Sequence, residues 1–130
     1  MTVGLSATNF ANKALDVLSG TSFTAPAGAY FQVHTADPGA AGTNGVSAGD
    51  ATRKSVTFSA ASAGAKAMNG TNPVWTNGGT SETLSHVSLW SASSAGSFLL
   101  SGALTSSKAW ASGDTFTLTS FSISLTPIAS

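Results

Sequence analysis

Two histidines are the first residues in this chain of 130 that could carry chemistry. His34 and His86 each lie in the middle of an expected strand, so they could meet across a sheet and bind a metal ion together. Neither has a carboxylate at a ligand spacing, and the chain has no cysteine that could complete a site. We therefore interpret both as hydrogen-bonded strand residues and predict no metal site and no cofactor.

The other reactive side chains also lack the partners that catalysis requires. A nucleophilic triad needs a serine with a histidine and a carboxylate in reach, and a serine-rich chain supplies candidate serines by chance alone. Asp37 precedes Pro38, where an aspartate side chain stabilises a turn. The glycine-rich segment 39–45 lacks the lysine of a phosphate-binding loop. We predict that the protein is not an enzyme.

Charge is scarce along the whole chain. Charged residues make up 8% of the sequence, and five basic residues balance five acidic ones. Nucleic acids and anionic membranes need several basic groups on one face, so neither is an expected partner. No apolar run approaches the roughly 20 residues that cross a bilayer, and residues 1–5 lack the basic start of a signal peptide. We expect synthesis in the cytoplasm of the host and, with so little charge, a place in an assembly.

One helix is expected near the N-terminus, over residues 9–19. Its apolar side chains spread over one side of a helical wheel and its polar side chains gather on the other. Thr8 is the expected N-cap, and Gly20 stands where a left-handed residue ends a helix. The apolar face of this helix must be covered by another surface.

The remainder of the chain has the alternation of short strands separated by turns. Such a pattern, with turns every 8 to 12 residues, is typical of an antiparallel β-sandwich or barrel. We predict a mainly β, α+β fold in a single domain over 1–130, with the helix at 9–19 and the sandwich at 29–126. The expected strands are 29–35, 54–59, 64–69, 73–76, 82–90, 98–100, 115–119 and 121–125.

Two segments are candidates for the surface. Residues 39–50 contain almost no large apolar side chain except Val46, which predicts an exposed loop. Trp110 lies in a polar stretch between Lys108 and Ser112, so we expect it to be an exposed anchor at a subunit interface. The other aromatic side chains are expected to fill the core, although exposed aromatics could also form a sugar-binding platform.

A series of short segments stands out by its order along the chain. It consists of His34-Thr35-Ala36-Asp37-Pro38-Gly39, Gly42-Thr43-Asn44, Val46-Ser47, Arg53, Val56-Thr57-Phe58, Ser85-His86-Val87-Ser88-Leu89-Trp90, the run Phe98-Leu99-Leu100-Ser101-Gly102-Ala103-Leu104-Thr105, Lys108 and Gly113-Asp114-Thr115. The order of these segments resembles a family of small phage virion proteins labelled tail fibre or minor structural proteins. The resemblance covers most of the chain, although residues 47–52 differ from the Gly-Gly-Tyr-Ala run that family members have before the arginine.

The resemblance implies a structural protein of the virion that binds other virion proteins. We expect a decoration protein on the outer capsid surface. A fibre shaft usually needs a long repetitive sequence, whereas a compact domain of this size suits a subunit bound to a larger shell. A tail fibre or minor tail protein for host attachment is the alternative, and a carbohydrate-binding module is a further one. The expected state is a homo-oligomer, preferably a trimer. The expected interface residues are Asp37, Asn44, Val46, Arg53 and Trp110.

Overall fold

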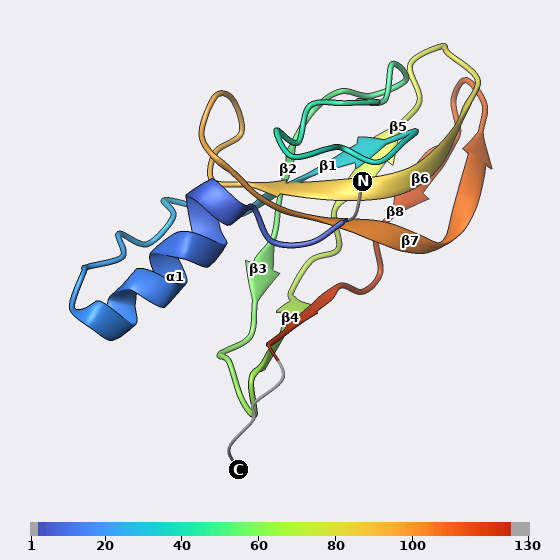
Figure 1. Ribbon diagram of the computed structural model, residues 1–130. Coiled ribbons are helices and arrows are strands. Elements are labelled where there is room, and N and C mark those ends of the chain that lie inside the picture. The colour runs from blue at the N-terminus through green and yellow to red at the C-terminus, as the bar shows by residue number, and fades with distance from the viewer. Residues whose placement is uncertain (1–2, 126–130) are drawn as a thin grey trace.

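The structure, a computed structural model, describes residues 3–125 and begins with the expected helix (Figure 1). A wide π-helical turn (Ala7–Ala11) leads into α1 (Asn12–Asp16), and a tight 3-10 turn (Val17–Ser19) follows. The N-cap is Ser6 rather than Thr8, because the Ser6 hydroxyl accepts a hydrogen bond from the Asn9 amide at 3.2 Å. Gly20 ends the helix with a φ of 87°, as predicted.

The strands form antiparallel sheets, which confirms the predicted β-sandwich with one N-terminal helix. The largest sheet has four strands in the order β2-β1-β6-β7, and two smaller ones have the orders β3-β4-β9 and β5-β8. Residue 126, the expected end of the sandwich, lies outside the described residues. The strand bounds are β1 (Tyr30–His34), β2 (Lys54–Ser55), β3 (Thr57–Phe58), β4 (Ala65–Asn69), β5 (Val74–Thr76), β6 (Glu82–Trp90), β7 (Phe98–Trp110), β8 (Thr115–Thr117) and β9 (Ser122–Ser124).

Strand β7 is much longer than the sequence predicts. Residues 98–100 were the expected strand, but β7 continues to Trp110 and pairs with β6 on both sides of an irregularity at residues 104–107. The sequence did not indicate this extension, because residues 103–109 are mostly small or polar and, apart from Leu104, are exposed at the edge of the sheet. A register shift between Leu84 and His86 also breaks the alternation expected in β6. Leu84 and Val87, an odd number of residues apart, therefore both lie in the core.

The main core lies between the four-stranded sheet and the two smaller sheets. Phe31 is fully buried at its centre, and its ring lies 4.8 Å from that of Phe121 on the segment leading into β9. Trp75 of β5 packs against Phe116 of β8 with ring centroids 6.0 Å apart. Phe31 and Val87 of the four-stranded sheet also share one buried cluster with Trp75 of β5, and Ile123 of β9 packs against it, which is the layer arrangement of a sandwich.

The opposite face of the same sheet is covered by residues 36–53, which corrects the expectation of an exposed loop over 39–50. Several residues of this loop are exposed, but Gly42 and Ser47 are buried. A β-carbon on Gly42 would lie 2.3 Å from the Phe98 ring, and Gly42 has a φ of 74°. Glycine at this position therefore allows both the turn and the close approach of the loop to β7.

Trp110 is a core residue, so the expectation of an exposed interface anchor is wrong. Only 2% of its surface is exposed, and its indole nitrogen donates a hydrogen bond to Oε1 of Glu82 at 3.2 Å. Glu82 and Trp110 are cross-strand partners at the far end of the β6–β7 pair. Trp110 is the last residue of β7, and its ring belongs to the same buried cluster as Trp75 and Leu84, so the polar residues near it in sequence do not indicate exposure.

Replacing Trp110 by alanine should therefore destabilise the fold rather than weaken an interface. We expect the free energy of unfolding to fall by about 3–5 kcal/mol, because a large buried side chain leaves a cavity. Chemical denaturation followed by circular dichroism measures this change. Val74→Ala, at a β5 side chain that is 45% exposed, is the control and should cost far less. A Trp110→Ala protein as stable as the parent would contradict the assignment to the core.

Candidate interaction surface

Three of the expected interface residues hold the covering loop against the sheet. The backbone oxygen of Asn44 accepts a hydrogen bond from Nδ1 of His34 at 2.8 Å. The side-chain amide of Asn44 donates one to the backbone carbonyl of Asp37 at 2.9 Å. Oδ1 of Asp37 accepts from the Gly39 amide at 2.8 Å, which confirms its predicted part in the turn. Val46 is half-buried and pairs with His34 as an isolated bridge. All three have structural contacts within the chain.

The histidines do meet across the sheet, since His34 of β1 pairs with His86 of β6. Among residues 3–125, however, no group of three potential ligands lies together, so the pair lacks the further donors that a metal site needs. His34 instead belongs to a buried network. Its Nε2 lies 2.7 Å from the hydroxyl of Ser88, which accepts a hydrogen bond from the Trp90 indole at 2.8 Å.

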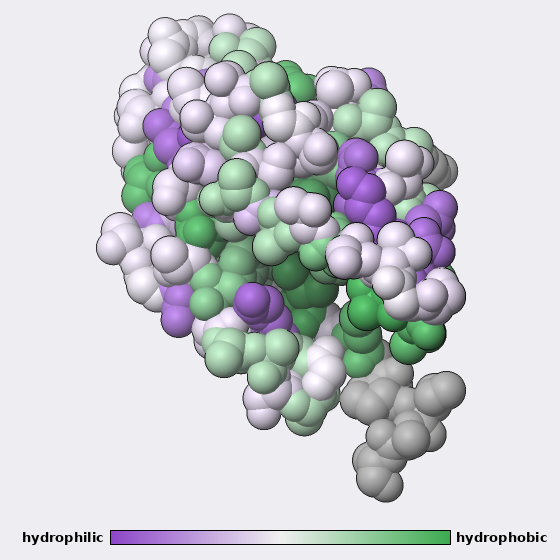
Figure 2. All heavy atoms as spheres, turned by 90° about the vertical axis from the view of Figure 1, so that its left-hand side faces the viewer, coloured by the Kyte–Doolittle hydropathy of each residue, from purple (hydrophilic) through white to green (hydrophobic). Residues whose placement is uncertain are grey.

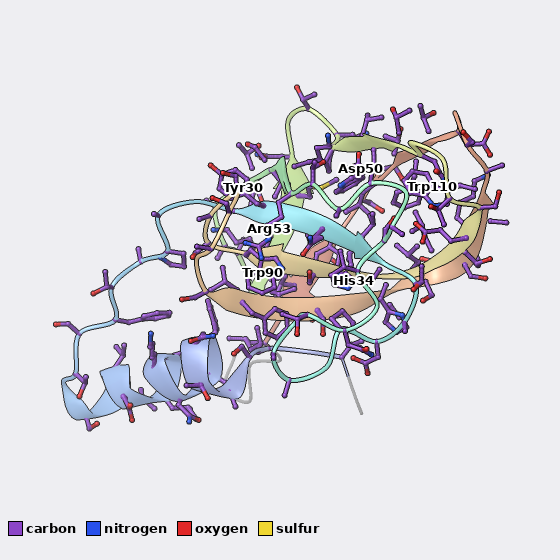
Figure 3. All side chains as sticks on the ribbon, turned by 90° about the horizontal axis from the view of Figure 1, so that it is seen from above. Tyr30, His34, Asp50, Arg53, Trp90 and Trp110 are labelled. Atoms are coloured by element: carbon purple, nitrogen blue, oxygen red, sulfur yellow. The ribbon has the colours of Figure 1, made fainter. Side chains whose placement is uncertain are left out.

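This network assigns one neutral tautomer to His34 (Figure 3). The Asn44 carbonyl can only accept, so Nδ1 carries the proton and Nε2 accepts from the Ser88 hydroxyl. Burial lowers the pKa of His34 below its ordinary value of 6.5, and the hydrogen bond to Asn44 opposes this effect only in part. The imidazole is therefore neutral where it links the sheet to the loop.

Arg53, the fourth expected interface residue, lies beside Trp90 at the other end of the sheet (Figure 3). Its guanidinium carbon is 3.6 Å from the centre of the Trp90 ring, a cation–π contact. Its Nη1 also donates to the carbonyl oxygens of Ala92 and Ala95, at 3.2 and 2.6 Å. Arg53 therefore holds the turn between β6 and β7 in place.

A serine pattern that the sequence analysis overlooked lies in the covering loop. Residues 45–49 read Gly-Val-Ser-Ala-Gly, the pattern of a hydrolase nucleophile turn. Ser47 is only 1% exposed, and its hydroxyl donates to Oε1 of Glu82. The segment also lacks the strand-to-helix turn of such enzymes. Here the serine anchors the loop.

The carboxylate of Glu82 accepts several of the hydrogen bonds that hold this loop in place. It accepts hydrogen bonds from the amides of Ala48 and Gly49 at 3.1 and 3.0 Å, besides those from Ser47 and Trp110. Burial raises the pKa of Glu82, but these four hydrogen bonds outweigh it and lower the pKa below the ordinary 4.5. The ionised carboxylate thus joins the loop to the β6–β7 pair.

The tryptophans do not form the exposed platform that a sugar-binding module would use. Trp75, Trp90 and Trp110 are 0%, 6% and 2% exposed, and the indole nitrogens of all three donate hydrogen bonds within the chain. Their faces are therefore occupied by the protein's own core.

Large exposed aliphatic side chains lie on the N-terminal helix. Only the first helical turn contacts the body, through β7, and the Asn9 side chain donates to the Phe98 carbonyl at 3.0 Å. The helix then projects away from the sheets (Figure 1). Leu15, Val17 and Leu18 are 64%, 49% and 87% exposed. No helix among residues 3–125 is long and apolar enough to span a membrane.

An apolar groove lies beside the base of this helix. It has a volume of about 610 Å³, and Lys66 is the only charged residue that lines it within residues 3–125. Figure 2 shows strongly hydrophobic side chains at the bottom of a hollow on this side of the molecule. We call the groove and the three exposed helix residues together the apolar end. The groove is lined by Leu5, Phe10, Ala25, Pro26, Gly28, Ala29, Val56, Phe58, Ala61, Gly64, Ala65, Lys66, Leu89, Leu99, Leu100, Ile123 and Leu125.

The apolar end was only half visible in the sequence. The helical pattern indicated that an apolar face needs a cover, but not that the body covers only its first turn. The groove draws its lining from six separate parts of the chain, so no local pattern could reveal it. An amphipathic helix with three large aliphatic residues at its far end was the one signal available.

A family model matches almost the whole chain. The model describes the podophage GP4 fiber I protein gp80, and the match covers residues 4–126. The chain belongs to this family. No curated protein matches the sequence.

Membership of the gp80 family confirms the resemblance to phage virion proteins. It makes the chain a structural protein of a bacteriophage, and it implies a place in the virion. In this gp80 family member, the residues of the loop and of the Arg53 contact hold one subunit together. Among residues 3–125, the apolar end is the part that leaves large aliphatic side chains of the helix exposed beside an apolar groove.

Acid should lower the free energy of unfolding of this gp80 family member through the protonation of His34. Because the folded pKa is below 6.5, the unfolded chain takes up the proton more readily. The free energy of unfolding should be fully retained above pH 6.5 and decrease as the pH falls below it towards the folded pKa. His34→Gln should remove this slope, as measured by denaturant titrations at a series of pH values.

Glu82→Gln is the matched control for this pH series. The Glu82 carboxylate contributes stability that is present above pH 4.5 and is lost as the pH falls through its lowered pKa, so its window lies lower. Glu82→Gln should thus change the slope only in that lower window. A slope between pH 6.5 and 4.5 that persisted in His34→Gln would contradict the assignment to His34.

Arg53→Lys should destabilise the fold although it keeps the positive charge. A lysine cannot place a flat cation on the Trp90 ring while donating to both carbonyls, so we expect a loss of about 1 kcal/mol. Thermal and chemical unfolding measure it. Lys54→Ala, which removes the neighbouring exposed cation paired with Asp50 at 3.7 Å, is the control and should cost about 0.5 kcal/mol or less. Equal losses in the two variants would argue against the stacking contact.

Proposed function

We propose that this protein is a fibre component of the phage tail that binds its neighbours in the virion through the apolar end. The observation that carries the proposal is the combination of a match to a fiber protein family over residues 4–126 with an uncovered apolar helix. Attachment to the host is then the task to which such a fibre contributes.

The distribution of contacts supports docking by the apolar end rather than by the loops. Residues 36–53 are tied to the sheet by His34, Glu82 and Arg53, so they form a firm cover on one face. The far half of the helix has no comparable cover, and Leu18 exposes 87% of its surface. Burying such side chains against a partner contributes about 25 cal/mol for each Å² of apolar surface.

Capsid decoration is the second candidate, and a compact domain suits it. In that arrangement residues 39–50 would cement neighbouring capsid subunits. Their hydrogen bonds to His34 and Glu82 leave them less free for that purpose, which favours the fibre placement together with the family description. The homo-oligomer, with a trimer preferred, remains part of the proposal for either placement.

Purified particles test the placement. A fibre component should be present in a handful of copies per particle, and gold-labelled antibodies should mark the tail in electron micrographs. Quantitative mass spectrometry against the major capsid protein supplies the copy number. Hundreds of copies with label over the capsid would contradict the fibre proposal and favour decoration.

A phage that carries Leu15→Glu/Leu18→Glu should tell whether the apolar end is the docking surface. We expect particles that contain strongly reduced amounts of this protein and that adsorb more slowly to host cells. The control phage carries Val74→Glu, a charge at an exposed aliphatic side chain on β5. Normal incorporation of the helix variant would argue against docking through the apolar end.

A further inference from the structure

We infer that the groove of one copy receives the helix end of a second copy of the same chain. This inference rests on the proposed function, because it names the first partner of the apolar end. It starts from two features of residues 3–125: a projecting helix with exposed aliphatic side chains, and an apolar groove that no other part of these residues fills.

The helix cannot fill the groove of its own chain with its far end. Its first turn is fixed to β7 by Asn9, and Ser6 pairs with the Leu99 carbonyl at 2.7 Å. Phe10 already lines the groove, and its ring packs edge-on against Phe23 at 5.4 Å. From that point the helix leads away from the sheets, so Leu15 and Leu18 are carried outward (Figure 1). They are placed to reach another molecule.

The chemistry of the two surfaces is complementary. The helix end presents Leu15 and Leu18, and the residue next to Leu15 is Asp16, which has an exposed carboxylate, while the exposed Lys13 lies earlier in the helix. The groove is apolar, and the charged group in its lining among residues 3–125 is the ammonium group of Lys66. A helix seated in the groove therefore buries its leucines against apolar walls and brings a carboxylate to an ammonium group.

The helix also needs such a cover to be stable. A helical segment of about a dozen residues is marginal in water without tertiary packing, and here only the first turn is packed against the body. The net charge of zero leaves no long-range repulsion between copies. A helix-to-groove contact joins two different patches, so it can be exchanged reciprocally in a dimer or close into a ring such as a trimer.

Two matched variants test the inference on the purified full chain. Leu15→Glu/Leu18→Glu alters the helix end, and Ala61→Glu places a charge at an exposed residue lining the groove. Each should weaken self-association about 100-fold or more, because a carboxylate would be buried against apolar surface. Light scattering coupled to size exclusion measures the mass. Val74→Glu should keep the parent mass, and circular dichroism should show that all variants are folded.

Mixing the two variants gives the decisive result. The intact groove of the helix variant can receive the intact helix of the groove variant, so the mixture should form heterodimers. Pairing of helix against helix would instead leave Ala61→Glu associated, which would overturn the inference. A monomeric parent protein would also overturn it. In that case the particle experiments could still support a fibre component that docks onto a different virion protein.

The absence of cysteine from the sequence allows a second, covalent measurement. Leu18→Cys mixed with Ala61→Cys should form disulfide-linked pairs, whereas Leu18→Cys alone should not. Charge reversal adds a check on orientation. Asp16→Lys and Lys66→Glu should each weaken association about 2- to 5-fold, and the double variant should recover the parent affinity. Crosslinking of Leu18→Cys alone, or no recovery in the double variant, would contradict the contact.

Discussion

The rest of this structure depends on the burial of both faces of the central strands β1 and β6. Neighbouring side chains on β1, such as Phe31 and Gln32, are both buried although they point to opposite sides. The apolar side is covered by the two smaller sheets, and the polar side by residues 36–53. A single sheet of this kind would be unstable in water, so the loop is a structural layer as much as a connection.

The polar face could be buried only because every polar group on it found a partner. Within residues 3–125, no buried side-chain nitrogen or oxygen lacks a hydrogen bond. His34, Ser88 and Trp90 satisfy one another, and the Gln32 amide donates to the Ala51 carbonyl at 2.7 Å. Buried polar groups without partners would each cost about 1–3 kcal/mol. The chain has so few charges that hydrogen bonds between neutral groups perform most of this task.

A firm body and a single uncovered end fit the requirements of a virion subunit. The β-sandwich supplies a rigid support, and Arg53 and Glu82 hold its loops in a chain that has no cysteine for disulfides. The helix projects away from the sheets (Figure 1), and the hydrogen bonds of Arg53 and Glu82 go to residues outside the apolar end, so the proposed docking there leaves these contacts intact. The match to the gp80 family extends from residue 4 to residue 126, so it spans both the helix and the sheets.

The sequence by itself determined the class of the fold and the limits of most elements. Alternation predicted β6 over residues 82–90, and Gly20 predicted the helix end, because both signals are local. The scarcity of charge and the family resemblance determined the kind of protein. Only the tertiary structure decided that Trp110 is buried and that residues 39–50 cover the sheet, since burial depends on partners distant in sequence. The groove likewise forms from six segments that are distant in sequence, so no local sequence pattern could predict it.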